Sequence, residues 1–326
     1  MFTLDELEQA GTLIAPQVAP TPVYRWPGLC SRAGCEVWLK HENHTPIGAF
    51  KVRGGLVYLD ELSRGPGLPR GIVTATRGNH GQSIPFAARL YNVPVTVLVP
   101  EGNSVEKNEA MRGWGAEVVV HGQDFDVARV EAGQRAEREG LLFAPSFHPA
   151  LVRGVATYAL ELFRAVENLD TVYVPIGMGS GICGLIKTRD LLGLKTDVVG
   201  VVAAEAPAVA LSFSAGRIVE TNSADTFADG MACRVPMPEP LAVVRAGAAR
   251  VIQVTETEIA GAMRALYADT HNVAEGAGAA AFAALMQERG RQRGRRVAAV
   301  LTGGNVDTDV FRTVLAGDVP LVGSKR

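Results

Sequence analysis

A lysine at position 51 stands in a setting that suits chemistry better than a place on the surface. It follows Phe50, a flat apolar side chain, and the segment GAFKVRGG over residues 48–55 is rich in small residues. Glycine and alanine leave room for a bulky group close to the backbone. A lysine removed from water has a lowered pKa, and its free amine can attack a carbonyl. The segment therefore predicts a nucleophilic lysine, with a solvated lysine at a helix start as the ordinary alternative.

A second stretch, TATRGNHGQ over residues 74–82, ends the apolar run GIVTAT. The backbone N–H groups of Thr76, Gly78, Asn79 and Gly81 can turn toward one point where a helix begins. Such a point is an anion site that suits a carboxylate. Asn79 could equally be a plain N-cap, and His80 alone is typical of a half-buried structural histidine.

A third stretch, PIGMGSGICG over residues 175–184, carries glycine at every second position and follows the run TVYV. Such a loop can wrap a phosphate at a helix N-terminus. It has no GK[ST] ending, so it is not a Walker loop. It does contain a GxGxxG match from Gly179 to Gly184, and Glu205 closes the next apolar run at the distance expected of a ribose-binding acid. Taken alone, the loop leaves a nicotinamide oxidoreductase open.

A fourth stretch, LTGGNVD over residues 301–307, follows the last apolar run. The hydroxyl of Thr302 followed by two glycines suits the wall of a pocket, although a plain turn would look the same. Ligands of open parallel sheets bind at the carboxyl ends of strands, and all four stretches follow strands or precede helices.

Short apolar runs alternate with helical patterns along the chain. The runs expected to be strands are EVWLK, GIVTAT, PVTVLVP, AEVVVHG, TVYVPI, DVVGVVAAE, RVIQVT and RVAAVLTGG. Helices are expected over 104–112, 124–139, 150–166 and 256–269. This alternation predicts α/β architecture, a mostly parallel sheet covered on both sides. Because the strands are too many for one core, we divide the chain into a small domain, 71–148, and a large domain, 1–70 plus 149–326.

Composition narrows the class of protein. The chain has 326 residues, 47% hydrophobic and 20% charged, with a net charge of −2. Such a balance gives no reason to expect binding to nucleic acid or to an anionic membrane, and no apolar stretch reaches membrane-spanning length. The cysteines are scattered without zinc spacing, so we expect no metal site. The acidic, amphipathic N-terminus is unlike a secretion signal, which predicts a cytoplasmic protein.

Together and in this order, the four stretches resemble the fold type II pyridoxal-phosphate enzymes, and within them the serine/threonine dehydratase and serine racemase branch. ENHTPIGAFKVRGG is similar to that family's cofactor-lysine segment, RGNHGQ to its asparagine loop, GMGSGICG to its phosphate loop and LTGGN to its pyridine-nitrogen segment. FADGMA and AEGAGAAAFAAL also match in order, so the resemblance covers nearly the whole chain. It implies two open, mostly parallel twisted sheets with helices on both faces, as in the tryptophan synthase β fold, and a homodimer.

The resemblance also implies residue roles. Lys51 would hold pyridoxal 5'-phosphate as a Schiff base, Phe50 would pack near the ring, Asn79 would contact the ring hydroxyl and Thr302 would face the pyridine nitrogen. The implied phosphate cradle is the backbone of Gly177, Met178, Gly179, Ser180 and Gly181. The implied substrate-binding residues are Thr76, Arg77, Gly78 and His80.

The implied reaction is a β-elimination. Lys51 would remove the Cα proton of L-threonine, L-serine or L-phenylserine, and the products would be a 2-oxo acid and ammonia. A hydroxyl at Thr302 cannot keep the pyridine nitrogen charged as a carboxylate would, and the resulting weaker electron sink suits elimination.

Several residues depart from the family pattern. Arg77 stands where a small residue, or the racemase's serine, is usual, which argues against racemisation. Ile47 and Ala49 replace two hydroxyl residues, and Leu211 stands where the racemase's second cation-binding carboxylate would be. Changes near the substrate favour a larger substrate such as phenylserine without deciding between it and threonine. A β-replacement synthase, a nicotinamide oxidoreductase and a non-catalytic scaffold remain as alternatives.

Overall fold

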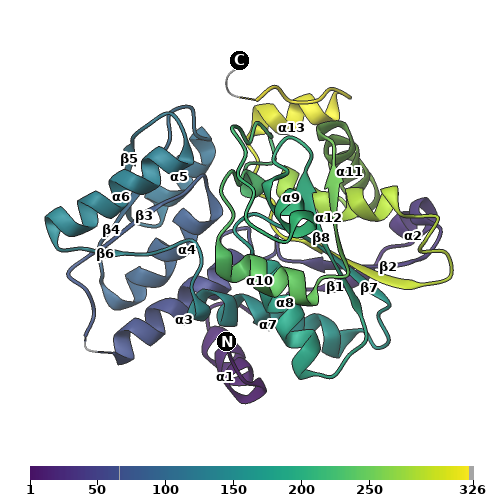
Figure 1. The fold of residues 1–326 in the computed structure, drawn as a ribbon, viewed down its shortest axis with the longest axis horizontal. Helices are drawn as coiled ribbons and strands as arrows, with labels where there is room; N and C mark the ends of the chain where they lie inside the picture. The colour runs from purple at the N-terminus through teal and green to yellow at the C-terminus, as the bar shows by residue number, and fades with distance from the viewer. Residues whose placement is uncertain (66, 323–326) are drawn as a thin grey trace. The chain divides into compact units, whose positions relative to one another are not determined.

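The computed structural model describes residues 1–65 and 67–322. They form two compact units, each built from two stretches of chain (Figure 1). Unit 1 consists of Met1–Ala19 and Thr45–Val155, and unit 2 of Pro20–His44 and Ala156–Arg326. No helix among the described residues is long and apolar enough to cross a membrane.

Unit 1 is built on a parallel four-stranded sheet in the order β5-β4-β3-β6. The strands are β3 (Ile72–Ala75), β4 (Val95–Val99), β5 (Ala116–Val120) and β6 (Leu142–Phe143). The helical segments are α1 (Leu4–Ile14), α3 (Lys51–Arg64), α4 (Asn79–Ala88), the 3-10 turn η1 (Arg89–Tyr91), α5 (Val105–Gly113), α6 (Phe125–Glu139) and the first turns of α7 (Pro149–Ala165).

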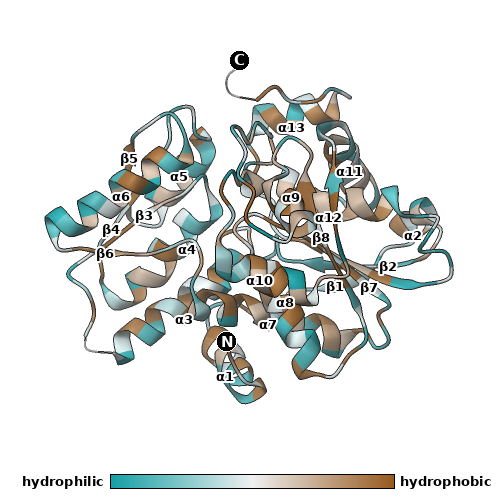
Figure 2. Cartoon of the chain, in the orientation of Figure 1, coloured by the Kyte–Doolittle hydropathy of each residue, from teal (hydrophilic) through white to brown (hydrophobic). Residues whose placement is uncertain are grey.

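Alternation along the strands of unit 1 places helices on both faces of its sheet. Ile72 and Val97 belong to the core that includes α1, α3 and α4, whereas Val73 and Leu98 belong to a second core with α6. Successive strand residues point to opposite faces, so each strand contributes to both cores. Figure 2 shows hydrophilic and hydrophobic residues mixed along α6, whose buried alanines recur every fourth residue.

Unit 2 is built on a six-stranded sheet in the order β1-β2-β10-β7-β8-β9, parallel except for the edge strand β1. The strands are β1 (Val23–Arg25), β2 (Glu36–His41), β7 (Thr171–Pro175), β8 (Asp197–Ala203), β9 (Arg250–Val254) and β10 (Arg296–Leu301). The helical segments are the rest of α7, α2 (Pro27–Ala33), α8 (Ser180–Leu191), α9 (Ala208–Ala215), η2 (Asp229–Met231), α10 (Pro238–Gly247), α11 (Glu256–Thr270), α12 (Gly276–Gln287) and α13 (Thr308–Leu315).

The predicted α/β class with mostly parallel sheets is confirmed, and every apolar run expected to be a strand forms one. The predicted helices become α5, α6, α7 and α11 with ends shifted by one residue at most. The sequence reading missed β1 and β6, because strands of three and two residues are too short to show alternation.

The division into units differs from the predicted domain boundaries. The small sheet also gathers α1, α3 and the start of α7, because Ile14 of α1 and Val52 and Leu59 of α3 share one core with Ile72 and Val97 of the sheet. These helices precede the sheet in sequence, so no pattern within them shows which sheet they cover. As a consequence Lys51 lies in the same unit as the 74–82 stretch.

Candidate functional site

Lys51 is the first residue of α3, and its amine is enclosed by protein although the residue as a whole is only half-buried. Its Nζ lies 5.0 Å from the centroid of the Phe50 ring. Burial lowers the pKa of the amine to about 8. At pH 7 about one amine in ten is therefore unprotonated, against fewer than about one in a thousand for an ordinary lysine. A desolvated amine with a lowered pKa can act as a nucleophile, and the catalytic role of Lys51 stays a prediction.

The glycines after Lys51 have a different use from the predicted one. A Cβ on Gly54 would lie 2.8 Å from the carbonyl oxygen of Leu151 in α7, and a Cβ on Gly55 would lie 2.3 Å from Oγ of Ser83 in α4. They let α3 pack closely on these helices, so the expectation that they leave room for a ligand was wrong. Ser83 Oγ also donates a hydrogen bond of 2.6 Å to the carbonyl of Lys51, which fixes the first turn of α3.

The 74–82 stretch joins β3 to α4, as expected for a loop at the carboxyl end of a strand. The N–H of Thr76 donates to the carbonyl of Leu98, and the N–H of Gly78 donates to Oγ1 of Thr76 at 3.0 Å. Those two donors are thus occupied within the protein. The backbone N–H groups of His80 and Gly81 have no hydrogen-bond partner among the described residues. The donors that could still bind an anion therefore lie in the first turn of α4.

His80 is buried beside Lys51, with 7% of its surface exposed. The carbonyl of Ala144 is its hydrogen-bond partner, whereas its Nε2 is buried with no partner. Burial, and then the positive charge of Lys51, lower the pKa of His80 to about 3. The imidazole is therefore neutral under ordinary conditions, and one of its nitrogens is unsatisfied.

Arg77 is half-buried in the loop before α4, and its Nε is buried without a partner. The described residues include no hydrogen-bond or ion-pair partner for its guanidinium. A second cation lies against the same loop: a Cβ on Gly78 would be 2.6 Å from Cδ and 3.4 Å from Nζ of Lys107. Lys107 is buried in the first turn of α5, and the sequence reading missed it because its stretch shows no more than a capped helix start.

In unit 2 the glycine-rich loop joins β7 to the start of α8. Gly179 caps α8 with φ of +96°, a conformation that favours glycine. A Cβ on Gly177 would lie 2.2 Å from the carbonyl oxygen of Gly230, so the FADGMA segment packs directly on the loop. The hydroxyl of Tyr158 donates to the carbonyl of Gly181 at 3.1 Å. A glycine-lined turn at the N-terminus of a three-turn helix fits a phosphate.

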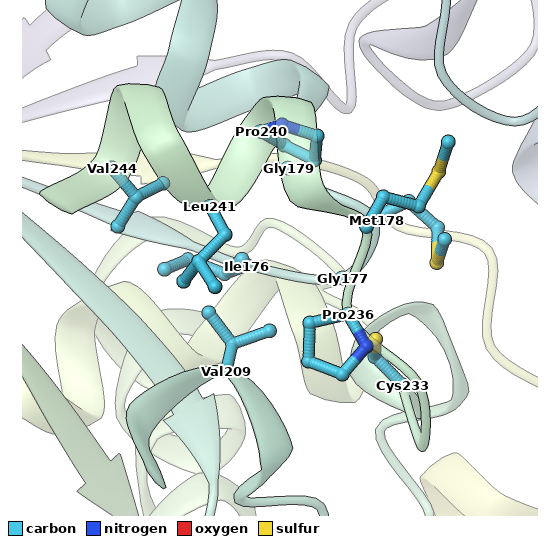
Figure 3. A pocket seen from close by; sticks show the side chains of 11 residues that line it. Ile176, Gly177, Met178, Gly179, Val209, Cys233, Pro236, Pro240, Leu241 and Val244 are labelled. Carbon is cyan, nitrogen blue, oxygen red and sulfur yellow. The ribbon is translucent and has the colours of Figure 1, made fainter. Parts of the chain in front are cut away.

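Apolar side chains support the glycine loop from one side, where they line a small pocket (Figure 3). Val209 of α9 and Leu241 and Val244 of α10 point into it, and Ile176 continues the line of β7. The pocket is lined by Ile176, Gly177, Met178, Gly179, Val209, Cys233, Pro236, Met237, Pro240, Leu241 and Val244. None of these lining residues is charged, so on this side the glycine loop is held in place by apolar packing.

Thr302 is the first residue after β10 and is 3% exposed. Its hydroxyl has no hydrogen-bond partner among the residues that the structure describes. The next residue, Gly303, is in close contact with α12, since a Cβ on Gly278 would lie 2.3 Å from its carbonyl oxygen. The predicted pocket-wall position is thus a buried strand end held by a close helix.

The carboxylates of Glu205 and Glu256 are close enough for their charges to interact. The sequence predicts no cation site in this region, because Leu211 stands where the resemblance implies a second carboxylate. Burial raises the pKa of Glu256, whose carboxylate accepts from the N–H of Phe227, and the charge of Glu205 raises it further. Leu211 is exposed on α9. In the described part of the chain, no group of three or more His, Cys, Asp or Glu side chains is placed to hold a metal ion.

Comparison with known proteins agrees with the four stretches. The model of the family described as pyridoxal-phosphate dependent enzyme matches residues 14–303. The L-threonine ammonia-lyase of Geobacter sulfurreducens is 34% identical over 310 residues, 95% of this chain and 77% of that protein. The catabolic L-threonine dehydratase of Escherichia coli is 31% identical over 309 residues, 93% of each chain. The structure of maize serine racemase superposes with a TM-score of 0.87 at 26% identity and covers 97% of each chain.

These matches confirm the resemblance and the fold that it implied. They also favour a phosphate cradle over a nicotinamide site for the GxGxxG segment, because the family match spans this loop together with Lys51 and Thr302. A nicotinamide site would explain the loop alone.

Proposed function

The chain belongs to the family of pyridoxal-phosphate-dependent enzymes, and we propose that it is a dehydratase and ammonia-lyase. Its reaction is the β-elimination of a 3-hydroxy amino acid to a 2-oxo acid and ammonia. The observation that carries the proposal is the buried amine of Lys51, with its pKa lowered to about 8, beside a helix start that suits a carboxylate.

The residues fit the cofactor of the family. We propose that Lys51 holds it covalently, that the loop from Gly177 to Gly181 binds its phosphate, and that Asn79 and Thr302 bind its ring. Support comes from the glycine cradle, in which a side chain at Gly177 would clash with Gly230, and from Thr302, a residue 3% exposed whose hydroxyl has no hydrogen-bond partner among the described residues. When bound, pyridoxal phosphate withdraws electrons from Cα of the amino acid.

The chain's own groups would then act in sequence. The first turn of α4 binds the substrate carboxylate, which orients the Cα–H bond. After the substrate has replaced the Lys51 amine on the cofactor, the free amine would be an effective base near neutral pH. Burial lowers the pKa of this amine toward the pH at which the enzyme works. The neutral hydroxyl of Thr302 would add no negative charge beside the ring, which would suit elimination of the β-hydroxyl.

For the substrate we propose L-threonine or L-serine, with L-phenylserine as the larger candidate. Relatives named L-threonine ammonia-lyase support the first choice. Arg77, Ile47 and Ala49, which depart from the family pattern that the resemblance implies, support a substrate pocket of different shape. Racemisation is disfavoured because arginine is not a ready base at neutral pH.

A substrate panel tests the proposal. The purified protein, loaded with pyridoxal phosphate, is offered L-threonine, L-serine and L-phenylserine, and 2-oxo acid and ammonia are measured. We expect equal amounts of both products from at least one of them without a second substrate. No 2-oxo acid or ammonia from any of them, with a β-thioether amino acid and water formed when a thiol is added, would instead identify a β-replacement synthase. Sedimentation of the same sample tests the proposed homodimer; a cytoplasmic location also stays a prediction.

A further inference from the structure

The side chain of His80 has a feature that the reaction outlined above does not use. It lies in the first turn of α4, it is 7% exposed, and its Nε2 is buried without a hydrogen-bond partner. An unsatisfied buried polar atom is destabilising, so a native structure that retains one calls for an explanation.

The contacts of the ring determine which kind of partner is missing. Because Nε2 has none, the bond to the carbonyl of Ala144 comes from Nδ1, and a carbonyl only accepts. Nδ1 therefore carries the ring proton. The same carbonyl accepts from Oγ1 of Thr74 at 2.8 Å, which fixes its position at the end of β6. Nε2 of the neutral ring is then a lone-pair acceptor, and the missing partner is a hydrogen-bond donor.

The surroundings place that donor on a ligand. His80 is close enough to Lys51 for the ammonium charge to act on it, yet the two side chains are not hydrogen-bonded to each other. The first-turn N–H groups of α4 are donors too, but none of them bonds to Nε2, which has no partner among the described residues. The low pKa of His80 keeps the ring unprotonated, so it accepts a proton in a hydrogen bond but is no acid for the leaving group.

We infer that Nε2 of His80 accepts a hydrogen bond from the 3-hydroxyl of the substrate and so selects 3-hydroxy amino acids over β-substituted amino acids without a donor. This inference rests on the proposed function. A site built to hydrogen-bond a hydroxyl discriminates strongly against an analogue that lacks it, because the buried acceptor stays unpaired. His80 is thus a specificity-determining residue, and Lys51 remains the base.

Two substitutions separate the halves of the ring. His80→Asn keeps a donor near the place of Nδ1 for the Ala144 carbonyl and removes the acceptor at Nε2. His80→Gln puts a carbonyl oxygen near the place of Nε2. Each variant is assayed with L-serine, whose leaving group carries a hydrogen, and with 3-chloro-L-alanine, whose leaving group does not. Gln82→Met is the matched control, because Gln82 is another buried side chain of α4 whose Nε2 has no partner among the described residues, but that atom is a donor and not an acceptor.

We expect His80→Asn to lower kcat/KM for L-serine roughly ten- to a hundredfold, chiefly through KM, and to leave 3-chloro-L-alanine within about twofold. His80→Gln should recover part of the loss. Gln82→Met should change kcat/KM by the same factor for both substrates. Cofactor absorbance and the unfolding midpoint should stay near the parent's.

Equal losses on both substrates, or no loss in His80→Asn, would overturn the inference and leave the proposed function standing. A parent enzyme inert toward every 3-hydroxy amino acid but active on 3-chloro-L-alanine would overturn both.

Discussion

Two helices, α4 in unit 1 and α8 in unit 2, each begin shortly after a buried parallel strand, but their first turns are made of different groups. At α4 the open backbone N–H groups of the first turn are joined by two side chains, Arg77 before the helix and His80 within it, whose Nε and Nε2 have no partner among the described residues. At α8 they are backbone groups of a glycine loop that apolar side chains support. Under the proposed function, the same strand-to-helix geometry serves substrate selection in unit 1 and phosphate binding in unit 2.

This difference predicts how substitutions behave. A change at α4 or Lys51 alters which groups can exchange protons or hydrogen bonds and should leave the fold intact. A side chain added in the loop before α8 would push that loop away from the backbone packed on it. Such a change should therefore lower the affinity for the cofactor and the stability of the fold together.

Replacing Lys51 by alanine should have the largest effect. We expect turnover to fall by at least 10²–10⁴-fold, the range of general-base catalysis, because both the covalent anchor and the base are lost. The circular-dichroism spectrum should match the parent's, since one side chain at a ligand site does not hold a core together. The measurement is 2-oxo acid release together with borohydride reduction of the cofactor. A Lys51→Ala protein that still forms a borohydride-reducible adduct would disprove the role of Lys51.

Gly177→Ala tests the other side of the comparison. The added methyl would lie 2.2 Å from the carbonyl oxygen of Gly230, so the loop has to shift. Overpacking of this kind costs about 1–3 kcal/mol, and we expect the Kd for pyridoxal phosphate to rise roughly five- to a hundredfold with a lowered unfolding midpoint. Fluorescence titration of the apoprotein measures the affinity.

The matched control for this change is Gly133→Ala in α6, where nothing lies within 4 Å of the added methyl. It should stabilise the helix by about 0.5–1 kcal/mol and leave the Kd unchanged. Equal cofactor affinity in the Gly177→Ala protein and the parent would show that this loop does not hold the phosphate.

Arg77→Ala should have an intermediate effect, confined to the substrate. An arginine without a partner among the described residues, beside the proposed anion site at the start of α4, is available to a carboxylate, and a charge-assisted hydrogen bond is worth about 1.5–3 kcal/mol. We expect kcat/KM to fall roughly ten- to a hundredfold while the cofactor stays bound, and Arg77→Lys to recover only part, since a planar fork binds a carboxylate in a way that an ammonium does not.

Arg112→Ala, which removes an exposed ion pair with Glu109, is the control and should match the parent. Steady-state kinetics with L-threonine and L-phenylserine compare the variants. Arginine variants that match the parent on both substrates would place the Arg77 guanidinium outside the substrate site.

The sequence was informative where chemistry and local pattern coincide. Lys51, Asn79, the glycine loop and Thr302 could all be singled out because each ends or begins a recognisable strand or helix. The free nitrogen of His80 and the buried Lys107 could not, because they depend on contacts with Ala144 and Gly78 that only the folded chain brings together. Gly54 and Gly55 were misread for the same reason: small residues leave space, but the fold decides whether a helix or a ligand fills it.

The smallest predicted effect is the pH dependence of covalent cofactor capture. It separates the Lys51 amine, which titrates, from the glycine loop before α8, which does not. Only the unprotonated amine of Lys51 can bond covalently to the cofactor, and burial lowers its pKa from 10.5 to about 8. The rate of covalent capture by the apoenzyme should therefore rise about fivefold between pH 7 and pH 8 and level off above about pH 9. Stopped-flow absorbance measures this rate. Pyridoxamine phosphate has the same phosphate but no aldehyde, so its binding to the loop should lack this rise. A capture rate that keeps rising about tenfold per unit up to pH 10 would mean that the amine titrates like a solvated lysine, and that burial at the start of α3 does not activate it.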